Sequence, residues 1–421
     1  MKKIFAFAIA VSCLLTLAAC GTEAEIVVPA ATSTPMPTAT PIPAPTASPT
    51  PVPTPEPPPV PEAKELTDSL ILSDSIGGAT DYLLYDPDVE THIDYREGNT
   101  LRIEAPEAIG SLYFIWYTPP EAYDMDLGGV SQTGGADGYL QEYIVLDTPA
   151  ESLTLSFRGH APLAQIRAFG VGTPSDDIHV WKAPCERADV LVFPTHADDD
   201  VIFFGALIAS CVDRGLAVQV AYLTEHYDWQ PRPQEQLNAL WALGVRNYPV
   251  LGSFPDYYVL SAEEAYASFD FDAVVARQTE LIRRFRPSVV FGHDRYGEYG
   301  HGAHILCSDA VESAVFAAGD ANACPDSAAR WGTWDVPKLY LHFADENPIW
   351  IDVLSPLEAF GGITAFDAAQ EAMLCHESQL QYPHRPQLEN EDFPRYDCRA
   401  FGLVRSLVGE DTGNDFMEHI G

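Results

Sequence analysis

The stretch Ala188-Asp-Val-Leu-Val-Phe-Pro-Thr-His-Ala-Asp-Asp-Asp200 determines how the rest of the chain is interpreted. Its apolar, β-branched run 190–193 is typical of a buried strand, and the strand stops at Pro194. A histidine and three consecutive carboxylates follow, and after them the apolar run 201–209 predicts a buried helix. Neighbouring carboxylates repel one another unless a cation lies among them, so this turn predicts a metal site.

The sequence after this stretch alternates strands with helices. The further predicted strands are 217–223, 288–291 and 338–343, and the predicted helices are 234–243, 271–285 and 367–380. Strands that alternate with helices in this order predict an α/β fold with a parallel, doubly wound sheet. Ligands of such sheets bind in the turns at the carboxyl ends of the strands.

A second loop with candidate ligands follows the predicted strand 288–291. It runs from Gly292 to His304 and contains three histidines, one aspartate and one glutamate. Both loops leave carboxyl ends of parallel strands, so they can face each other across one edge of the sheet. A hydrolytic zinc site needs about three protein ligands, an open position for water and a nearby carboxylate that takes a proton. The two loops together contain these groups.

The motifs His196-Ala-Asp-Asp-Asp200 and His301-Gly-Ala-His304 resemble (Pro/Ala)-His-Pro-Asp-Asp-Glu and His-Pro-Asp-His of the PIG-L/LmbE family of zinc-dependent N-deacetylases. The similarity covers about residues 186–405. It implies a Rossmann-like α/β domain that removes the acetyl group from an N-acetylglucosamine-type sugar. Ala197, Asp200 and the pair 302–303 depart from the family's pattern, but they remove neither a ligand nor the base.

The resemblance implies a role for each motif residue. A Zn²⁺ ion would be held by His196, Asp199 and His304, and Asp198 would be the general base. His301 and Tyr299 would stabilise the oxyanion, and whether His301 or Asp198 protonates the leaving amine stays open.

The resemblance also implies substrate contacts. Arg232 and Asp256 match positions on the sugar side of the family's site, and His376-x-Ser378-Gln379 matches a late motif of uncertain role. Arg232 could instead pair with Glu235 on the protein surface.

Other site residues also have structural explanations. An aspartate of the first motif could simply cap a helix. His293 and Asp294 could support the ligands or belong to an ordinary loop, and His342 is interpreted as structural.

The first residues predict export. Lys2 and Lys3 precede an apolar run, 4–17, which is too short to span a bilayer, and Leu17-Ala-Ala-Cys20 resembles the bacterial lipobox. We therefore expect a lipoprotein signal peptide, 1–20, and membrane attachment through a lipid on Cys20, on the extracellular side of the bacterial cytoplasmic membrane. An ordinary signal peptide is the alternative.

Two segments separate this leader from the deacetylase-like domain, 179–421. Residues 21–64 form a Pro/Thr-rich linker, since 14 of the chain's 35 prolines lie in 29–61. Residues 65–178 contain short apolar runs between Gly, Pro and Asp turns, which predicts a small β-sandwich module. This module could bind carbohydrate or dock another surface. The aromatic residues Trp116, Tyr117 and Tyr123 could stack on sugar or belong to the core.

Cysteine and charge patterns limit the remaining possibilities. No CxxC pair occurs, which argues against a thiolate zinc site. An exported protein can form disulfides, and the cysteine pairs closest in sequence are 307/324 and 375/398. The formal charge of −38 argues against nucleic acid and anionic membrane surfaces as partners.

Three functions remain open from the sequence. The first is deacetylation of an N-acetylated amino sugar or glycoconjugate, such as a cell-wall or surface glycan. The second is non-catalytic glycan binding by a surface lipoprotein, and the third is zinc amidase activity on a non-sugar acylated amine. A pure binding protein does not need Asp198 beside the ligands, so an enzyme is favoured.

Overall fold

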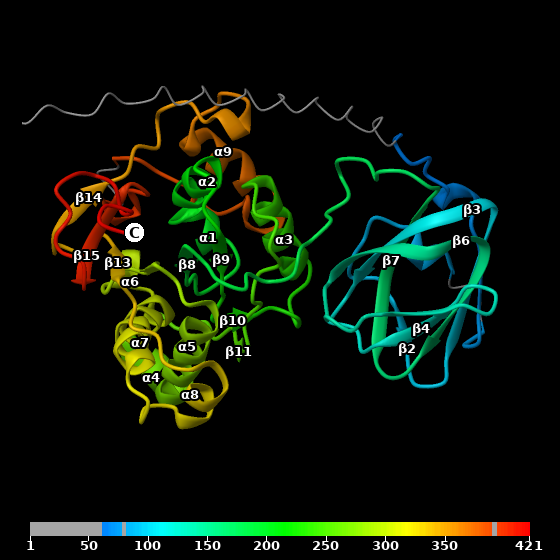
Figure 1. Cartoon of the computed structure of the whole chain (residues 1–421), viewed down its shortest axis with the longest axis horizontal. Coiled ribbons are helices and arrows are strands. Elements are labelled where there is room, and N and C mark those ends of the chain that lie inside the picture. The colour runs from blue at the N-terminus through cyan, green and yellow to red at the C-terminus, as the bar shows by residue number, and fades with distance from the viewer. Residues whose placement is uncertain (1–60, 78–80, 390–393) are drawn as a thin grey trace, which may run out of the picture. The chain divides into compact units, whose positions relative to one another are not determined.

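The computed structural model describes residues 61–77, 81–389 and 394–421 (Figure 1). The predicted signal peptide, Cys20 and most of the predicted linker lie outside these residues. The described residues belong to one compact unit, Pro59–Gly421. None of the helices in this part of the chain is long and apolar enough to cross a membrane.

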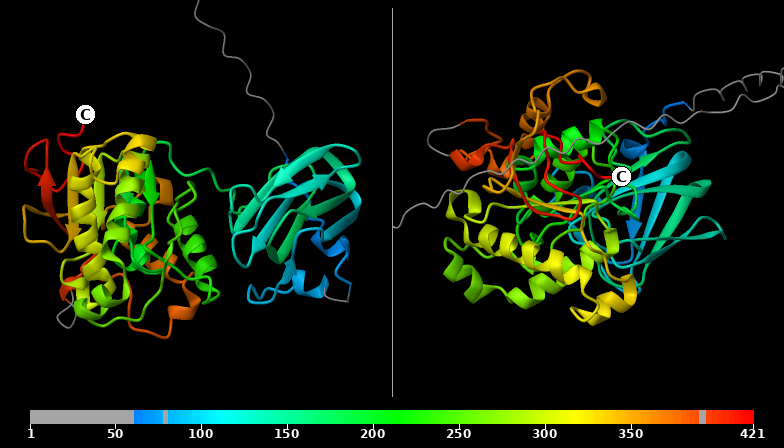
Figure 2. Two further views of the ribbon diagram at one scale, coloured as in Figure 1. Left: turned by 90° about the horizontal axis from the view of Figure 1, so that it is seen from below. Right: turned by 60° about the vertical axis from the view of Figure 1, so that its left-hand side comes forward.

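The N-terminal part of this unit is rich in strands. In chain order they are β1 (Ile71–Asp74), β2 (Ile93–Tyr95), β3 (Thr100–Trp116), β4 (Tyr123–Asp126), β5 (Ser131–Gly134), β6 (Gln141–Phe157) and β7 (Ala161–Phe169). They form one antiparallel sheet in the order β2-β7-β3-β6-β4-β5, with β1 paired to β3. Register shifts interrupt the pairing of the two longest strands, β3 and β6, and the sheet curls (Figure 2). A separate sandwich domain stays a prediction.

The core of this sheet contains two of the aromatic residues considered as sugar platforms. Trp116 and Tyr123 are fully buried, and both donate hydrogen bonds to Glu142 Oε2, at 3.0 Å from the indole nitrogen and 2.7 Å from the hydroxyl. Tyr117 stacks on His92 with ring centroids 4.0 Å apart. The proposal that Trp116 and Tyr123 stack on sugar is therefore wrong, because their ring faces are occupied by the core.

The C-terminal part contains a six-stranded sheet in the order β14-β15-β13-β12-β8-β9. Four strands are parallel: β8 (Val190–Val192), β9 (Val218–Val220), β12 (Val289–Gly292) and β13 (Lys338–His342). Two antiparallel strands, β14 (Pro348–Trp350) and β15 (Ala400–Ser406), extend one edge. The structure confirms the parallel strands, whereas β14 and β15 were not predicted. The Rossmann-like designation stays a prediction.

Nine α-helices are assigned within the described residues. They are α1 (Asp199–Ile202), α2 (Gly205–Asp213), α3 (Arg232–Ala242), α4 (Ala262–Ser268), α5 (Phe271–Phe285), α6 (Gly297–Gly300), α7 (Gly302–Gly319), α8 (Pro325–Trp331) and α9 (Ala365–Met373). Short 3-10 helices occupy Thr67–Ser69, Asp81–Leu84, Glu358–Phe360, Glu377–Gln379 and Pro394–Tyr396. Two further strands of two residues each, β10 (Thr224–Glu225) and β11 (Phe254–Pro255), pair in parallel with each other.

The parallel strands divide the helices into two layers. Alternate strand residues point to opposite faces of a sheet. Val190 and Val192 belong to a core shared with α2, α3 and α9, whereas Leu191 and Val290 belong to a second core shared with α5 and α7. Figures 1 and 2 show these two groups of helices on opposite sides of the strands. The central strands are therefore covered on both faces, as their apolar sequence requires.

Buried amide side chains connect the strand-rich part to α3. Gln141 Nε2 donates to Gln234 Oε1 at 3.1 Å and to Asn238 Oδ1 at 2.8 Å. Gln234 in turn donates to the carbonyl of Trp116 at 3.0 Å, and Gln230 to that of Tyr117 at 2.7 Å. The helix that begins at Arg232 is thus attached to β3 and β6 by side-chain hydrogen bonds.

The disulfide pairings suggested by sequence are wrong. The cysteines in the described part of the chain are free thiols: Cys185, Cys211, Cys307, Cys324, Cys375 and Cys398. Cys307 is buried on α7, with its Sγ 3.4 Å from Gln278 Nε2, whereas Cys324 is partly exposed just before α8. Closeness in sequence was misleading because Cys307 lies near the start of α7, whereas Cys324 follows the end of that helix.

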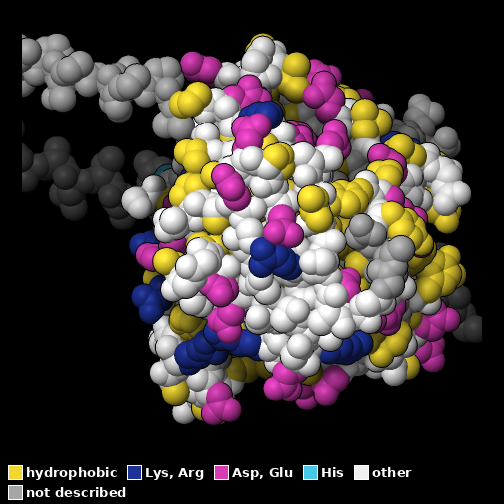
Figure 3. Space-filling view, turned by 90° about the vertical axis from the view of Figure 1, so that its right-hand side faces the viewer, with side chains coloured by type: hydrophobic (Ala, Val, Ile, Leu, Met, Phe, Trp, Pro, Cys, Tyr) yellow, Lys and Arg dark blue, Asp and Glu magenta, His cyan; other side chains and the backbone are white. Residues whose placement is uncertain are grey.

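The face drawn in Figure 3 carries acidic and basic side chains scattered among hydrophobic ones. The acidic excess of the chain is spread over this face and forms no single block there. The concentration of carboxylates that matters for chemistry lies instead at the carboxyl ends of the parallel strands.

Candidate active site

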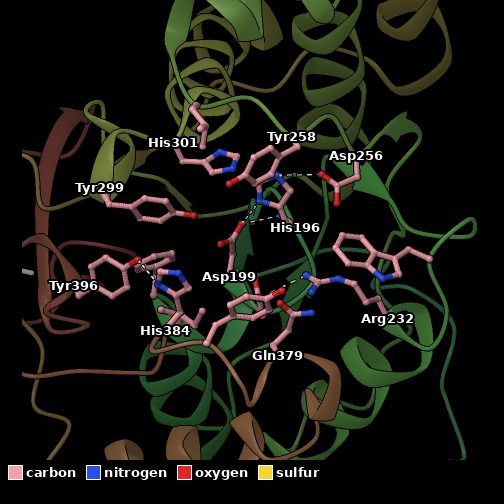
Figure 4. Close-up of a pocket in the computed structure, with 16 residues that line it drawn as sticks. His196, Asp199, Arg232, Asp256, Tyr258, Tyr299, His301, Gln379, His384 and Tyr396 are labelled. Carbon is pink, nitrogen blue, oxygen red and sulfur yellow. Dashed lines mark hydrogen bonds and ion pairs between the residues drawn. The ribbon is translucent and has the colours of Figure 1, made fainter.

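The two predicted ligand loops meet at the carboxyl ends of β8 and β12. His196 Nδ1 lies 3.0 Å from Asp199 Oδ2, and His304 Nε2 lies 3.2 Å from the same oxygen. The two ring nitrogens lie 3.2 Å apart, and all three residues are buried. Residues more than a hundred positions apart in sequence therefore present one nitrogen, one oxygen and one nitrogen to a common point. Figure 4 shows two of the three residues, His196 and Asp199, at the cavity.

The surroundings of the two histidines determine which ring atoms face this point. Glu298 Oε2 lies 2.7 Å from His304 Nδ1, and Asp256 Oδ1 lies 3.5 Å from His196 Nε2. A carboxylate on the far side of an imidazole holds the ring proton there, so the other nitrogen is free to act as a ligand. His196 Nδ1 and His304 Nε2 can thus both direct lone pairs toward Asp199.

This arrangement fits a metal ion. Donor atoms bound tetrahedrally to zinc at about 2.0–2.1 Å lie about 3.3–3.4 Å apart, close to the separations found here. Burial opposes ionisation of Asp199, but His304 and His196 hold the pKa of its carboxyl well below the usual range. Although burial opposes it, Asp199 and Glu298 raise the pKa of His304 to about 10. The site thus favours a positive charge at its centre.

Two further sets of possible ligands each share two residues with this triangle: His196, His301 and His304, and Asp199, His293 and His304. The nitrogens of His293 are already used, however. Its Nε2 accepts a hydrogen bond from the backbone N–H of Thr195 at 3.0 Å, and its Nδ1 lies 3.0 Å from Glu298 Oε1. His293 therefore supports the ligand loop, which decides between the two interpretations of this residue that the sequence left open.

Glu298 is the residue that the sequence did not single out. Its fully buried carboxylate lies beside the ring nitrogens of His304, His293 and His342, and it accepts a hydrogen bond from the backbone N–H of Asp294 at 3.1 Å. The backbone of Glu298 has a φ of 54°, which few residues other than glycine adopt. The sequence showed only that Glu298 lies six residues before the candidate ligand His304. It could not show that the Glu298 side chain points toward the histidine rings.

His342 and Asp294 are also placed behind the ligands. His342 Nδ1 lies 3.2 Å from Glu298 Oε1, and its Nε2 lies 3.0 Å from the carbonyl of Asp397, consistent with a structural residue. Asp294 is buried, and its two carboxylate oxygens accept hydrogen bonds from Nε and Nη2 of Arg395. This pair attaches the second candidate ligand loop to the C-terminal part of the chain.

The candidate base, Asp198, lies beside the ligand triangle in a strained backbone. Its φ is 104°, a conformation that L-residues rarely adopt, and its N–H donates to Asp200 Oδ1 at 3.0 Å. Burial raises the pKa of the Asp198 carboxyl to about 6, and that of Asp200 to about 8. Asp198 can therefore exchange a proton near neutral pH, whereas Asp200 supports its backbone.

A cavity of about 390 Å³ opens onto this triangle, a volume typical of small-molecule sites. Seven of the eight predicted site residues line it: His196, Asp198, Asp199, Arg232, Asp256, Tyr299 and His301. The eighth, His304, is fully buried beneath the others. The structure thus brings the predicted residues together, while their individual roles stay predictions.

His301 and Tyr299 lie where an oxyanion could be reached. The His301 ring lies 4.8 Å from that of His196, centroid to centroid, and burial lowers the pKa of His301 to about 2. Tyr299 is half exposed, and burial raises the pKa of its hydroxyl above the usual range. Both groups are therefore uncharged at neutral pH, with N–H and O–H groups available to donate.

Arg232 is buried, and the alternative of a surface pair with Glu235 is wrong. Its guanidinium donates to the carbonyl of Ala197 and lies 3.5 Å from Asp198 Oδ2. Glu235 instead accepts hydrogen bonds from the N–H and hydroxyl of Ser378, at 2.6 and 2.7 Å. The first turn of α3 therefore faces the acidic loop on one side and the late motif on the other.

Asp256 contacts histidines as well as the cavity. Its Oδ2 lies 3.2 Å from Nδ1 of His226, whose Nε2 accepts the N–H of Ala197 at 3.0 Å. Burial raises the pKa of Asp256, but His226 and His196 outweigh this and lower it to about 2. Sequence reasoning missed His226, because an isolated histidine after a strand carries no motif.

The remaining cavity walls were also missed, apart from Gln379, which belongs to the late motif His376-x-Ser378-Gln379. They include residues of the loop before α3, of the loop before α4 and of the segment after α9: Trp229, Tyr258, Leu260, Gln379, Tyr382, His384 and Tyr396. His384 Nδ1 lies 2.8 Å from the hydroxyl of Tyr396. These segments have no periodic pattern, so the direction of their side chains could not be predicted.

Comparison with protein families identifies the region around the site. Residues 191–315, under a third of the chain, match the family model described as PIG-L: GlcNAc-PI de-N-acetylase. This segment contains both ligand loops and relates the chain to the PIG-L deacetylases.

Two curated relatives carry the same activity in their names. A 1D-myo-inositol 2-acetamido-2-deoxy-alpha-D-glucopyranoside deacetylase 1 of Catenulispora acidiphila is 25% identical over 215 residues, 45% of this chain and 65% of the relative. The deacetylase of Geodermatophilus obscurus with that substrate name is 31% identical over 179 residues, 36% of this chain and 60% of the relative. The chain thus spans less than two thirds of the length of either relative.

Solved structures match over a similar share of the chain. A conserved protein from Thermus thermophilus is 25% identical and covers 46% of this chain and 80% of its own, with a TM-score of 0.34. An N,N'-diacetylchitobiose deacetylase from Pyrococcus horikoshii is 19% identical and covers 46% of this chain and 71% of its own, with a TM-score of 0.35. Each match leaves about half of this chain without a counterpart.

Proposed function

We propose that this protein is a zinc-dependent N-deacetylase that hydrolyses the acetamide of an N-acetylglucosamine-type sugar or glycoconjugate. The observation that carries the proposal is the triangle of His196, Asp199 and His304 at one cavity, with the carboxylate of Asp198 beside it and not part of the triangle. Three protein ligands with an open side are the arrangement of hydrolytic zinc sites, whereas structural zinc sites have four protein ligands.

The chain's own residues supply the remaining steps. A zinc ion held by the three ligands would polarise the amide carbonyl and acidify a water molecule. Asp198, with its pKa raised to about 6 by burial, takes the proton of the attacking water. His301 and Tyr299 donate hydrogen bonds to the oxyanion, and Asp198 or His301 returns a proton to the leaving amine.

The substrate class rests on the relatives and on the cavity. The two curated relatives are named as deacetylases of an acetamido sugar joined to inositol. The cavity walls combine carboxylates, histidines and tyrosines, so they can bind hydroxyl groups as well as the acetyl group.

We also propose that the protein acts at the cell surface, lipid-anchored through Cys20 on the extracellular side of the bacterial cytoplasmic membrane. This part of the proposal rests only on the sequence of residues 1–20, which lie outside the described residues. Labelling with a radioactive fatty acid in a bacterial host, compared between the protein and its Cys20→Ala variant, tests it. Label that persists in the variant would contradict the anchor.

Acetate release tests the activity. The zinc-loaded protein is incubated with N-acetylglucosamine, N-acetylglucosaminyl conjugates and acylated amines without a sugar. We expect acetate from the sugars, loss of activity with a chelator and recovery when zinc is returned. Turnover of the non-sugar amines alone would favour an amidase, and zinc-independent sugar binding without acetate would favour a glycan-binding protein.

A further inference from the structure

Large aromatic side chains surround the mouth of the cavity and remain exposed. Trp229 is 55% exposed, Tyr258 86%, Tyr299 45% and Tyr382 46%, although all four line the cavity. They come from four separate segments, and Figure 4 shows Tyr258 and Tyr299 with the catalytic groups around the same cavity. We call these four residues the aromatic rim.

Exposed aromatic rings gathered at one place indicate a binding surface. The rim is continuous with the cavity that holds Asp198 and the ligand triangle. A molecule that covers the rim during the reaction is therefore the continuation of the substrate whose acetamide lies in the cavity. The question is which chemistry this continuation has.

The charges around the cavity disfavour an anionic continuation. Among the described residues that line it, Arg232 is the one arginine or lysine, and its guanidinium is engaged by Ala197 and Asp198. A phosphate or carboxylate inside the cavity would find no free arginine or lysine among these lining residues. It would instead meet the negative charges of Asp198 and Asp256. Arg385, next to the rim, donates to the backbone carbonyls of Leu380, Tyr382 and His384 and does not line the cavity.

The composition of the rim also disfavours a lipid chain. Leu260 is the exposed aliphatic residue that accompanies the rim, whereas three of the four rim residues are tyrosines. A tyrosine offers an apolar ring face and a hydroxyl at its edge. A sugar ring matches both, because its C–H face can lie on the aromatic ring while its hydroxyl groups form hydrogen bonds.

We propose that the aromatic rim binds further sugar units of a neutral oligosaccharide whose N-acetylated unit occupies the cavity. This inference rests on the proposed deacetylase function and specifies its substrate as a chain of at least two or three uncharged sugars. Tyr258 is the most exposed rim residue, so replacing it disturbs the least packing.

The test compares substrates of increasing length. The ratio of kcat/KM for the trisaccharide of N-acetylglucosamine to that for the monosaccharide is measured for the zinc-loaded protein and for Tyr258→Ala, Tyr258→Phe and Tyr82→Ala. Tyr82 is an exposed tyrosine of the strand-rich part, at 63% exposure, and does not line the cavity. We expect a ratio well above one in the protein, in Tyr258→Phe and in Tyr82→Ala, and a fall of about three- to tenfold in Tyr258→Ala.

Binding provides a readout that does not depend on turnover. The affinity of the inactive Asp198→Asn variant for the same oligosaccharides is measured by calorimetry, with and without Tyr258→Ala. An affinity that increases with the length of the oligosaccharide and depends on Tyr258 supports the rim. If the unchanged protein nevertheless releases no acetate, the deacetylase proposal fails and the rim proposal stands. Acetate release with a ratio near one, or faster hydrolysis of a phosphorylated conjugate, overturns the rim and leaves the deacetylase intact.

Discussion

At the scale of single residues, Glu298 organises the candidate metal site from behind. It faces the nitrogens of His304 and His293 that point away from the ligand triangle. Burial opposes its ionisation, but those two histidines hold the pKa of Glu298 well below the usual range. The carboxylate of Glu298 therefore fixes the ring orientation of the proposed ligand His304. It also fixes that of His293, which supports the loop containing His196.

The Glu298→Gln variant tests this role. Glutamine keeps the shape of the side chain but offers only one acceptor oxygen, so His304 loses a charged partner. We expect zinc affinity to fall about 10–100-fold. Competition with a fluorescent chelator measures it, and Glu371→Gln on the exposed side of α9 is the matched control. If the two variants bind zinc equally well, Glu298 does not orient the ligand.

The Asp198→Asn variant separates the base from the ligands. Asparagine cannot take a proton at neutral pH, whereas the triangle of His196, Asp199 and His304 is left in place. We therefore expect kcat to fall about 10²–10⁴-fold while one zinc ion per chain is retained. Steady-state acetate release and metal analysis of the same sample measure the two quantities. Normal turnover with zinc bound would rule out Asp198 as the base.

Sequence identified the residues of the triangle but not the residues that direct them. His196, Asp199 and His304 could be found because they match the two short motifs of the family that the sequence resembles, one directly after β8 and the other nine to twelve residues after β12. Glu298 and His226 could not be assigned a role, because their importance lies in the direction of a side chain. Direction depends on loop backbone, including the positive φ of Glu298, which no pattern in the sequence encodes.

At the scale of elements, the predicted helices and strands agree with the structure where the sequence carries clear start and stop residues. The predicted helix 271–285 coincides with α5, because Asp270 accepts the N–H of Ala273 at its start and Pro287 follows its end. The predicted helix 367–380 stops earlier, since α9 ends at Met373. Strands β14 and β15 were missed because they pair antiparallel at the edge, without the alternating helix that predicted the others.

The attachment of α3 gives a prediction at this scale. Gln141 Oε1 lies 2.8 Å from His179 Nδ1 and 3.0 Å from Trp181 Nε1, while its nitrogen binds Gln234 and Asn238. The Gln141→Ala substitution removes these hydrogen bonds from two buried partners, Trp181 and Gln234, and from two partly buried ones, His179 and Asn238. We expect the free energy of unfolding to fall by about 1–3 kcal/mol.

Urea denaturation measures this change. Asn322→Ala is the control, because Asn322 is exposed and its side chain bonds, within the described residues, to the nearby Asp320. Equal stability of the two variants would mean that the amide contacts of Gln141 do not hold α3 to the strand-rich part.

At the scale of the whole molecule, the strand-rich part and the α/β part share one core. Buried residues of β3, such as Phe114, and of α2, such as Leu207, belong to the same continuous cluster. The sequence predicts two modules, because their strand patterns differ clearly, and whether the strand-rich part is a separate domain stays a prediction. Patterns of periodicity describe each segment alone and carry no information about the surface that joins it to another segment.

A shared core predicts cooperative unfolding. We expect a single thermal transition that coincides when it is followed by far-ultraviolet circular dichroism and by tryptophan fluorescence. Tryptophans lie in both parts, for example Trp116 and Trp334, so the fluorescence reports on each. Two transitions separated by several degrees would show that the strand-rich part folds independently.

The most direct test of the whole account is the position of the metal itself. Diffraction data from crystals grown with zinc, collected on both sides of the zinc absorption edge, locate the ion without reference to activity. We predict one ion at bonding distance from His196 Nδ1, Asp199 Oδ2 and His304 Nε2, with the remaining coordination position open toward the cavity. An ion bound elsewhere, or four protein ligands that close the site, would contradict the account.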